Sequence, residues 1–312
     1  MDHDGTNWER NVIAKLATDA LAEQKKARRW GIVFKVLTFS YLFILLFIGL
    51  GWLGQGDSIE NGEHTALVEL NGVIAADAQA NADDVTAGLK AAFEAEGTQG
   101  VVLRINSPGG SPVQSSVINN EIRRLRELHP EIPLYAVVED ICASGGYYVA
   151  VAADQIFVDK ASIVGSIGVL MNGFGFTGAM DKLGVERRLL TAGENKGFLD
   201  PFSPLEADQQ AHARSMLGEI HNQFIDAVKQ GRGERLKGSD VVFSGLMWTG
   251  EKSVELGLTD ALGSVAYVAR EVVQAEKIIN YSRRENLAER LVRRFGATLG
   301  DALVQGLSPS LQ

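Results

Sequence analysis

The amino-acid sequence predicts an α/β protein with parallel strands, preceded by a single membrane-spanning helix. Residues 36–53 carry no charged side chain over 18 positions, which is long enough to cross a bilayer. Beyond residue 65, short apolar runs alternate with amphipathic stretches of helical period. Strands that alternate with helices at this spacing are typical of βαβ units, in which neighbouring strands run parallel.

Composition excludes several classes of protein. The chain has 312 residues, 46% of them hydrophobic, and a net charge of −9, which argues against a partner made of nucleic acid. Its one cysteine, Cys142, rules out an internal disulfide. The HExxH spacing and the GxGxxG fingerprint after a strand are both missing, so we expect no metal and no cofactor.

The N-terminal region predicts an anchor with a defined orientation. Residues 1–30 form a polar cytoplasmic segment, residues 31–53 the transmembrane anchor, and residues 54–64 a linker. A cleavable signal peptide is the competing interpretation, but the region before the apolar run is too long and no A-x-A site follows it. Basic residues at 25–29 precede the span and acidic residues follow it. The positive-inside rule therefore places the bulk of the protein outside the cytosol, which in a bacterium means the periplasm or the outer face of the membrane.

The region from residue 65 to residue 275 is predicted to be one α/β domain, and residues 276–312 an amphipathic helical tail. Ser203 is the expected N-cap of the longest helix. Strands are expected at 66–73, 100–106, 134–138, 155–158 and 185–190, and helices at 80–95, 114–128, 145–154, 176–183, 204–229, 253–256 and 264–275.

The segment from Cys142 to Gly146 lies between a predicted buried strand and a predicted helix, and the rest of the chain is organised around it. Gly145 and Gly146 let the backbone turn sharply and approach a substrate carbonyl closely. Ser144 would then stand at a helix N-terminus, where it serves either as an N-cap or as a nucleophile. Cys142 reads as a buried apolar side chain.

A nucleophilic serine needs a base. No histidine has a promising sequence position, and all five read as solvated: His3, His64, His129, His212 and His221. The GxSxG elbow is missing too. A lysine acts as a base only when burial removes its proton. Lys196 lies in a glycine-flanked loop after a predicted strand and is the candidate for such a buried base. The alternative is an ordinary loop lysine that is exposed to solvent.

Four features in this order resemble the bacterial signal peptide peptidase A family of serine proteases, in the Clp protease and crotonase superfamily. They are NSPGGS at 106–111, ASGGYYVA at 143–150, VGSIGV at 164–169, and Lys196 lying 52 positions after Ser144. The similarity runs from about residue 66 to about residue 275. The resemblance implies a crotonase-like spiral of βαβ units and a homo-oligomeric ring or dome at the membrane.

The resemblance also implies roles for individual residues. Ser144 is the nucleophile, Lys196 is the general base, and Ser166 orients the lysine amine. The oxyanion hole is expected to use the N–H groups of Gly110 and Gly145, with Gly109 as a further candidate. In a chain with a single repeat, Lys196 completes either its own site or that of a neighbouring protomer.

The substrates that the resemblance implies are cleaved signal peptides and other short hydrophobic peptides. Three alternatives stay open at this point. They are an anchored quality-control protease acting on membrane proteins, a non-catalytic scaffold in which Ser144 only caps a helix, and an acyl-CoA enzyme of the crotonase branch. The anchor and the outside orientation argue against the last.

Overall fold

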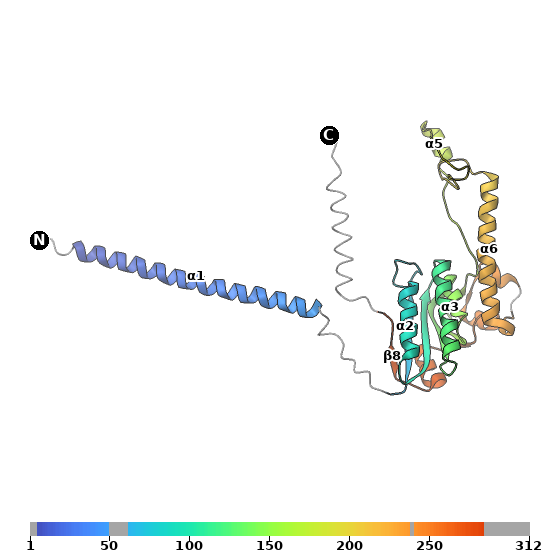
Figure 1. The fold of residues 1–312 in the computed structure, drawn as a ribbon, viewed down its shortest axis with the longest axis horizontal. Coiled ribbons are helices and arrows are strands. Elements are labelled where there is room, and N and C mark those ends of the chain that lie inside the picture. Colours follow the sequence, from blue (N-terminus) through green and yellow to red (C-terminus); the bar gives the residue numbers. More distant parts are fainter. Residues whose placement is uncertain (1–4, 50–61, 238–239, 284–312) are drawn as a thin grey trace. The chain divides into compact units, whose positions relative to one another are not determined.

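The computed structural model describes residues 5–49, 62–237 and 240–283 of the chain (Figure 1). Residues divide into two compact units, one made of 1–60 with 285–312 and the other of 61–284. The described part of the first unit is a single helix, α1 (Gly5–Gly49). Most of the predicted linker and of the C-terminal tail lies outside the described residues.

Helix α1 joins the predicted cytoplasmic segment and the predicted anchor into one continuous helix. Its stretch Ala14–Phe47 is long and apolar enough to cross a membrane, and its most apolar window buries none of its surface within the chain. Large apolar side chains are exposed in the part of this stretch that the structure describes, such as Phe39, which is 72% exposed. Exposed apolar side chains on a helix of this length are consistent with a membrane anchor.

The second unit is an α/β domain. Its strands are β1 (His64–Asn71), β2 (Thr98–Ser107), β3 (Leu134–Ala143), β4 (Gln155–Val158), β5 (Ile163–Gly165), β6 (Met247–Thr249), β7 (Ala261–Leu262) and β8 (Ile278–Asn280). Its helices are α2 (Ala82–Glu94), α3 (Pro112–Leu128), α4 (Gly145–Ala150), α5 (Thr177–Leu183), α6 (Ala207–Arg232), α7 (Gly250–Glu255) and α8 (Val265–Tyr267), with shorter turns η1 (Gly233–Arg235), η2 (Asp240–Phe243) and η3 (Val268–Val273).

The strands form one eight-stranded sheet with the order β6-β5-β3-β2-β1-β8, and β4 and β7 continue from β3. All the pairs are parallel except the edge pair of β5 and β6. Strand β3 pairs with β4 along its first half and with β5 at its last residues. The α/β prediction and its parallel βαβ units are therefore confirmed.

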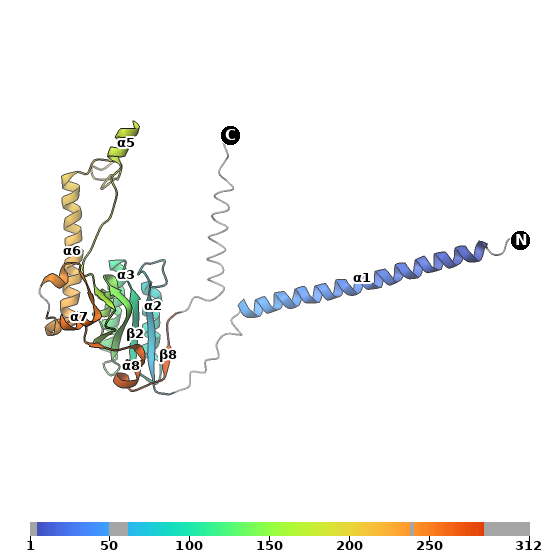
Figure 2. The same ribbon diagram turned by 180° about the vertical axis from the view of Figure 1, so that it is seen from behind.

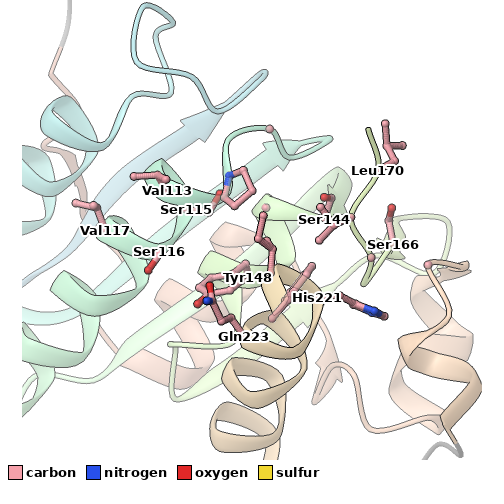
Figure 3. Close-up of a pocket in the computed structure, with 18 of the residues that line it drawn as sticks. Val113, Ser115, Ser116, Val117, Ser144, Tyr148, Ser166, Leu170, His221 and Gln223 are labelled. Carbon is pink, nitrogen blue, oxygen red and sulfur yellow. The ribbon is translucent and has the colours of Figure 1, made fainter. Parts of the chain in front are cut away.

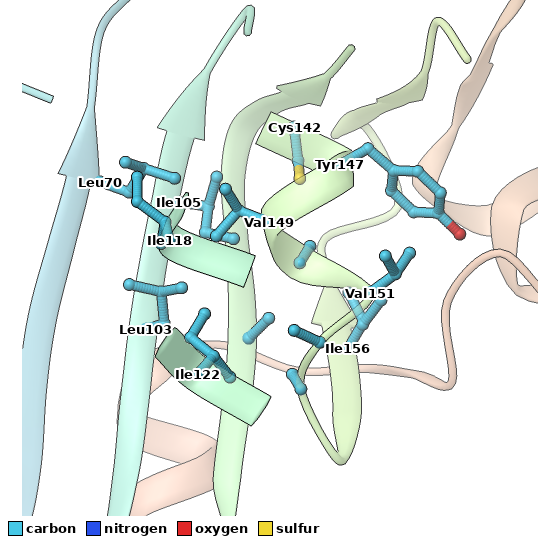
Figure 4. Packing of buried hydrophobic residues seen from close by; sticks show 14 of the residues in the cluster. Leu70, Leu103, Ile105, Ile118, Ile122, Cys142, Tyr147, Val149, Val151 and Ile156 are labelled. Carbon is cyan, nitrogen blue, oxygen red and sulfur yellow. The ribbon is translucent and has the colours of Figure 1, made fainter. Parts of the chain in front are cut away.

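Two layers of helix cover the two faces of the sheet, because successive strand residues point to opposite sides. On one side, Leu103 and Ile105 of β2 are fully buried against Ile118 and Ile122 of α3 (Figure 4). On the other side, Val102 belongs to a smaller cluster that includes residues of β4 and η3. This packing makes β2 and β3 the buried centre of the domain.

Three local predictions were wrong. The strand predicted at 185–190 is irregular and exposed, because no strand among the described residues pairs with it. The long helix α6 begins at Ala207 with Glu206 at its N-cap. Ser203 instead donates its hydroxyl hydrogen bond to Asp200, at 2.7 Å between the oxygens. The predicted tail helix starts as strand β8, where Ile279 pairs with Ala66 of β1.

His64 was also wrongly predicted to be solvated. Its side chain is buried, and its Nε2 lies 2.9 Å from the Tyr281 hydroxyl and 3.2 Å from Thr98 Oγ1. Its Nδ1 lies 3.0 Å from the carbonyl oxygen of Gly62. These contacts tie the entry of β1 to the chain that follows β8.

Residues 169–206, which we call the arm, pack mainly on themselves. Phe176 stacks on Phe202 with ring centroids 5.3 Å apart. Arg187 pairs with Asp200 at 3.2 Å between Nε and Oδ2. Helix α5 of the arm stands beyond the N-terminal end of α6, away from the sheet, in both views (Figures 1 and 2). Besides its two end segments, the arm contacts the start of α6, where Phe198 packs against His212 with ring centroids 5.6 Å apart and the Leu199 N–H donates to Gln209 Oε1 at 3.0 Å.

Candidate active site

Three neighbouring parallel strands end at one place. Ser107 closes β2, Ala143 closes β3 and Gly165 closes β5, and β3 pairs with both of the others. The loop after each strand carries part of the sequence-predicted site: Gly109 and Gly110, Ser144 with Gly145, and Ser166. Carboxyl ends of parallel strands are where α/β proteins form their sites.

Ser144 sits in a strained backbone conformation between β3 and α4. Its φ is +52° and its ψ −123°, a region that residues with a side chain seldom occupy. Its N–H donates to the carbonyl of Gly165 at 2.8 Å. Helix α4 is held in the core by Tyr147, whose hydroxyl donates to the carbonyl of Leu258 at 2.7 Å. Strain of this kind persists when the surrounding structure fixes it.

The Ser144 hydroxyl does not cap the helix. Although Ser144 occupies the N-cap position of α4, its side chain makes no capping hydrogen bond. The side chain is half-buried and lines a pocket. The sequence left two interpretations open, a helix cap and a nucleophile. The hydrogen bond that a helix cap requires is not formed by Ser144.

The glycine turn after β2 lies against Ser144. Gly109 has φ +96°, and a Cβ added there would lie 2.7 Å from the Ser144 Cβ and 2.6 Å from the Gly145 nitrogen. A Cβ added at Gly110, where φ is +151°, would overlap the carbonyl oxygen of Ile74. Only glycine permits this approach of one backbone to another.

Two backbone N–H groups beside Ser144 are unpaired within the described part of the chain. Neither Gly110 nor Gly145 donates its N–H to any described residue, whereas the Gly109 N–H donates to Ser107 Oγ at 3.1 Å. The Gly110 nitrogen would lie 3.2 Å from a Cβ placed on Gly145. Two free donors next to a hydroxyl can stabilise negative charge on an oxygen bound there.

Ser166 shares the unusual backbone of Ser144. Its φ is also +52°, and its N–H donates to the carbonyl of Leu246 at 2.8 Å, next to the β5–β6 pair. Ser166 lines the same pocket as Ser144, Gly110 and Gly145. The structure thus brings four of the six sequence-predicted residues to one pocket, with Gly109 directly behind it.

The pocket has a volume of about 880 Å³ and is lined from α3, α4, α6 and the segment after β5 (Figure 3). Its walls are largely apolar. Tyr148 of α4 and Phe224 of α6 pack with ring centroids 5.1 Å apart. Its remaining apolar side chains are Pro112, Val113, Val117, Val169, Leu170 and Ile220. Such walls suit an apolar ligand.

Lys196 does not line this pocket. It lies in the arm, exposed to solvent, in a turn where its N–H donates to the carbonyl of Gly193 at 3.1 Å. Within one chain, the structure therefore leaves the predicted base apart from the predicted nucleophile.

Two other residues bear on the prediction. Cys142 is fully buried, and burial raises the pKa of its thiol far above the ordinary value, so it is no nucleophile. His221, which the sequence analysis set aside, lines the pocket. The signal that could have found it is helical spacing, because His221 precedes the buried Phe224 by three positions and Val228 by seven.

Comparison with known proteins finds similarity to peptidases. The model of peptidase family S49 matches residues 126–279. A putative protease of Methanocaldococcus jannaschii is 31% identical over 218 residues, which cover 69% of each chain. A putative signal peptide peptidase SppA of Enterococcus faecium is 28% identical over 228 residues, covering 70% of this chain and 66% of that one.

A further relative is much longer than the matched stretch. The Na⁺/H⁺ antiporter NhaA of Brucella melitensis is 46% identical over 187 residues, which are 60% of this chain. Those residues are 25% of the antiporter, so this chain spans about a quarter of that relative.

Proposed function

Because this chain belongs to peptidase family S49, we propose that it is a membrane-anchored serine peptidase whose nucleophile is the Ser144 hydroxyl. One observation carries the proposal: a serine hydroxyl that makes no capping hydrogen bond, on a strained turn beside the N–H groups of Gly110 and Gly145, which donate to no described residue. A serine that only caps a helix needs neither a free hydroxyl nor free N–H donors beside it. A nucleophilic serine needs both, because its hydroxyl must be free to attack and the oxygen of the tetrahedral intermediate must be stabilised.

The reaction follows from these groups. Ser144 Oγ attacks the carbonyl carbon of a peptide bond while its proton passes to the Lys196 amine. The carbonyl oxygen becomes negative and accepts hydrogen bonds from Gly110 and Gly145. The C–N bond then breaks, the lysine returns the proton to the leaving amine, and a water molecule hydrolyses the acyl-serine ester by the same route. Ser166 holds the lysine amine in place.

We assign Lys196 to the pocket of a neighbouring copy of the chain. Its exposure on an arm that packs mainly on itself supports this assignment. The arm also carries large apolar side chains that its own chain leaves exposed, including Leu190 at 96%, Leu183 at 77% and Phe174 at 77%. Patches of this kind favour association with another protein surface. Docking of the arm would bury the lysine, as a general base requires.

The proposed substrates are signal-peptide remnants and other short hydrophobic peptides. The apolar walls of the pocket support this choice, as does the similarity to the Enterococcus faecium relative. Helix α1 would hold the pocket near the membrane in which such peptides remain. The basic residues before the apolar stretch favour a cytoplasmic N-terminus and a catalytic domain on the outer face of the bacterial cytoplasmic membrane.

Complementation between two inactive variants tests the proposal. We expect full-length Ser144→Ala and Lys196→Ala each to lose peptide hydrolysis by about 10³-fold or more, because each removes a member of one catalytic unit. Mixed oligomers of the two variants should regain activity, since some sites would combine an intact serine with an intact lysine. Lys182→Ala, which changes another exposed lysine of the arm, is the matched control and should stay active.

Fluorophosphonate labelling separates the parts of the proposal. Labelling of the wild type and not of Ser144→Ala is expected, and an unlabelled wild type would identify a scaffold. Full activity of Lys196→Ala would remove the lysine from the mechanism. If mixing restored nothing while each variant folded and assembled, the shared site would be wrong and the serine assignment would stand.

A further inference from the structure

His221 of helix α6 makes a hydrogen bond at the wall of the pocket. Its Nε2 lies 3.1 Å from the carbonyl oxygen of Ile167, and its half-buried ring lines the pocket with Ser144 and Ser166 (Figure 3). A carbonyl oxygen only accepts hydrogen bonds, so Nε2 must carry the proton and donate it. This contact requires a proton on Nε2, whereas a general base acting through Nε2 would need that nitrogen to be unprotonated.

The segment that receives this hydrogen bond is held by contacts on two sides. Strand β5 ends at Gly165, and residues 166–170 continue without a strand partner. On one side the Ser166 N–H donates to the carbonyl of Leu246. On the other, the Ile167 side chain is fully buried and its carbonyl accepts from His221. These contacts fix the backbone on both sides of the strained φ of Ser166.

We propose that His221 is a positioning residue: through the Ile167 carbonyl it holds Ser166 and Gly168 in the pocket wall. This inference rests on the proposed peptidase function, in which the Ser166 hydroxyl orients the base and the wall contacts the substrate. Without the imidazole donor, the 166–168 backbone can shift away from α6. Shifts of about 1 Å in catalytic groups cost up to roughly 100-fold in rate.

Three substitutions in the full-length protein test the proposal. His221→Gln keeps an amide N–H that can reach the same carbonyl, and we expect at least about half of the wild-type kcat/KM. His221→Phe fills the space of the ring without a donor, and His221→Ala removes both. We expect kcat/KM of these two to fall by roughly 10- to 100-fold, mostly in kcat. Asn222→Ala, on the exposed face of the same helix, is the control and should match the wild type.

Melting temperatures identify variants that fail to fold, and His221→Phe keeps the test decisive if the alanine variant does so. Wild-type activity in His221→Phe would overturn the proposal, because the hydrogen bond would then be dispensable. A glutamine variant as inactive as the alanine variant would overturn it too, since the imidazole itself would be required. A wild type that cleaves no peptide would instead overturn the proposed function.

Discussion

The sheet and the arm hold their apolar side chains in opposite ways. In β2, Val101, Leu103 and Ile105 are each fully buried under helices of the same domain. In the arm, Leu170 is 83% exposed and Leu190 is 96% exposed. The arm carries large apolar side chains, but no described layer of helix or strand covers them. The apolar side chains of the strand are therefore buried within the chain, whereas those of the arm are half-buried or exposed.

This difference separates the groups of the candidate site. The strained turns of Ser144 and Ser166 follow strands of the buried sheet, which can hold them against their strain. Lys196 belongs to the arm, which has no such support. Groups that need accurate geometry are thus fixed by the domain, and the predicted base is placed where a second protein surface can receive it.

The largest expected effect on stability comes from a buried ion pair beside the sheet. Arg232, whose side chain is 1% exposed, donates to both carboxylate oxygens of Asp260 at 2.8 and 2.9 Å. Asp260→Ala leaves the guanidinium buried without its partner, and the free energy of unfolding should fall by about 3–5 kcal/mol. Denaturant titration measures this change. Glu255→Ala, which removes an exposed partner of Lys252, should cost less than about 1 kcal/mol.

The same pair should make the stability depend on pH. Burial opposes ionisation of Asp260, but hydrogen bonds and charge from Arg232 outweigh it and lower the pKa of the carboxyl below its ordinary value. A lowered folded pKa stabilises the protein above the unfolded value of about 3.9. That contribution disappears as the pH falls through the folded pKa. The wild type and Asp260→Ala should therefore converge in stability in acid. A constant difference from pH 7 to pH 3 would contradict this explanation.

A glycine of the site should give the next largest effect. A Cβ at Gly110 would overlap the Ile74 carbonyl, so Gly110→Ala must move the turn that carries its N–H. Losing one oxyanion donor costs about 10²- to 10³-fold in kcat. Gly218→Ala is the control, because nothing lies within 4 Å of a Cβ there and its helix should gain up to about 1 kcal/mol. Peptide hydrolysis, with melting curves to verify folding, compares the two. Equal activity would remove Gly110 from the site.

Local pattern predicted the elements that bury their own apolar side chains. The runs at 100–106 and 134–138 appear as β2 and β3, because a continuous apolar sequence suits a strand covered on both faces. The glycine turn and Ser144 were found for a related reason, since both interrupt such a run at its end. These features depend on a few consecutive residues.

Features that depend on distant partners were missed. Strand β8 has only three residues, and its partner β1 lies at the opposite end of the domain's sequence. Its own short sequence therefore did not indicate a strand, and it was assigned to the helix predicted for the tail. His64 is buried by Thr98 and Tyr281, neither of which is near it in the sequence. The run at 185–190 has the composition of a strand, but the fold provides no neighbour for it. His221 reaches the pocket through the packing of α6.

The smallest expected effect lies in the arm and tests whether the two regions are independent. Arg187 pairs with Asp200 at 3.2 Å, and its guanidinium carbon lies 5.8 Å from the centre of the Phe202 ring. Because these contacts are partly exposed, Arg187→Ala should accelerate amide hydrogen exchange in the arm only a few-fold. Exchange in β2 and β3 should not change, since no strand of the sheet contributes to these contacts. Faster exchange in the sheet would mean that the arm and the sheet unfold together. The arm would then not be an independent element that binds a second protein surface through exposed side chains such as Leu190.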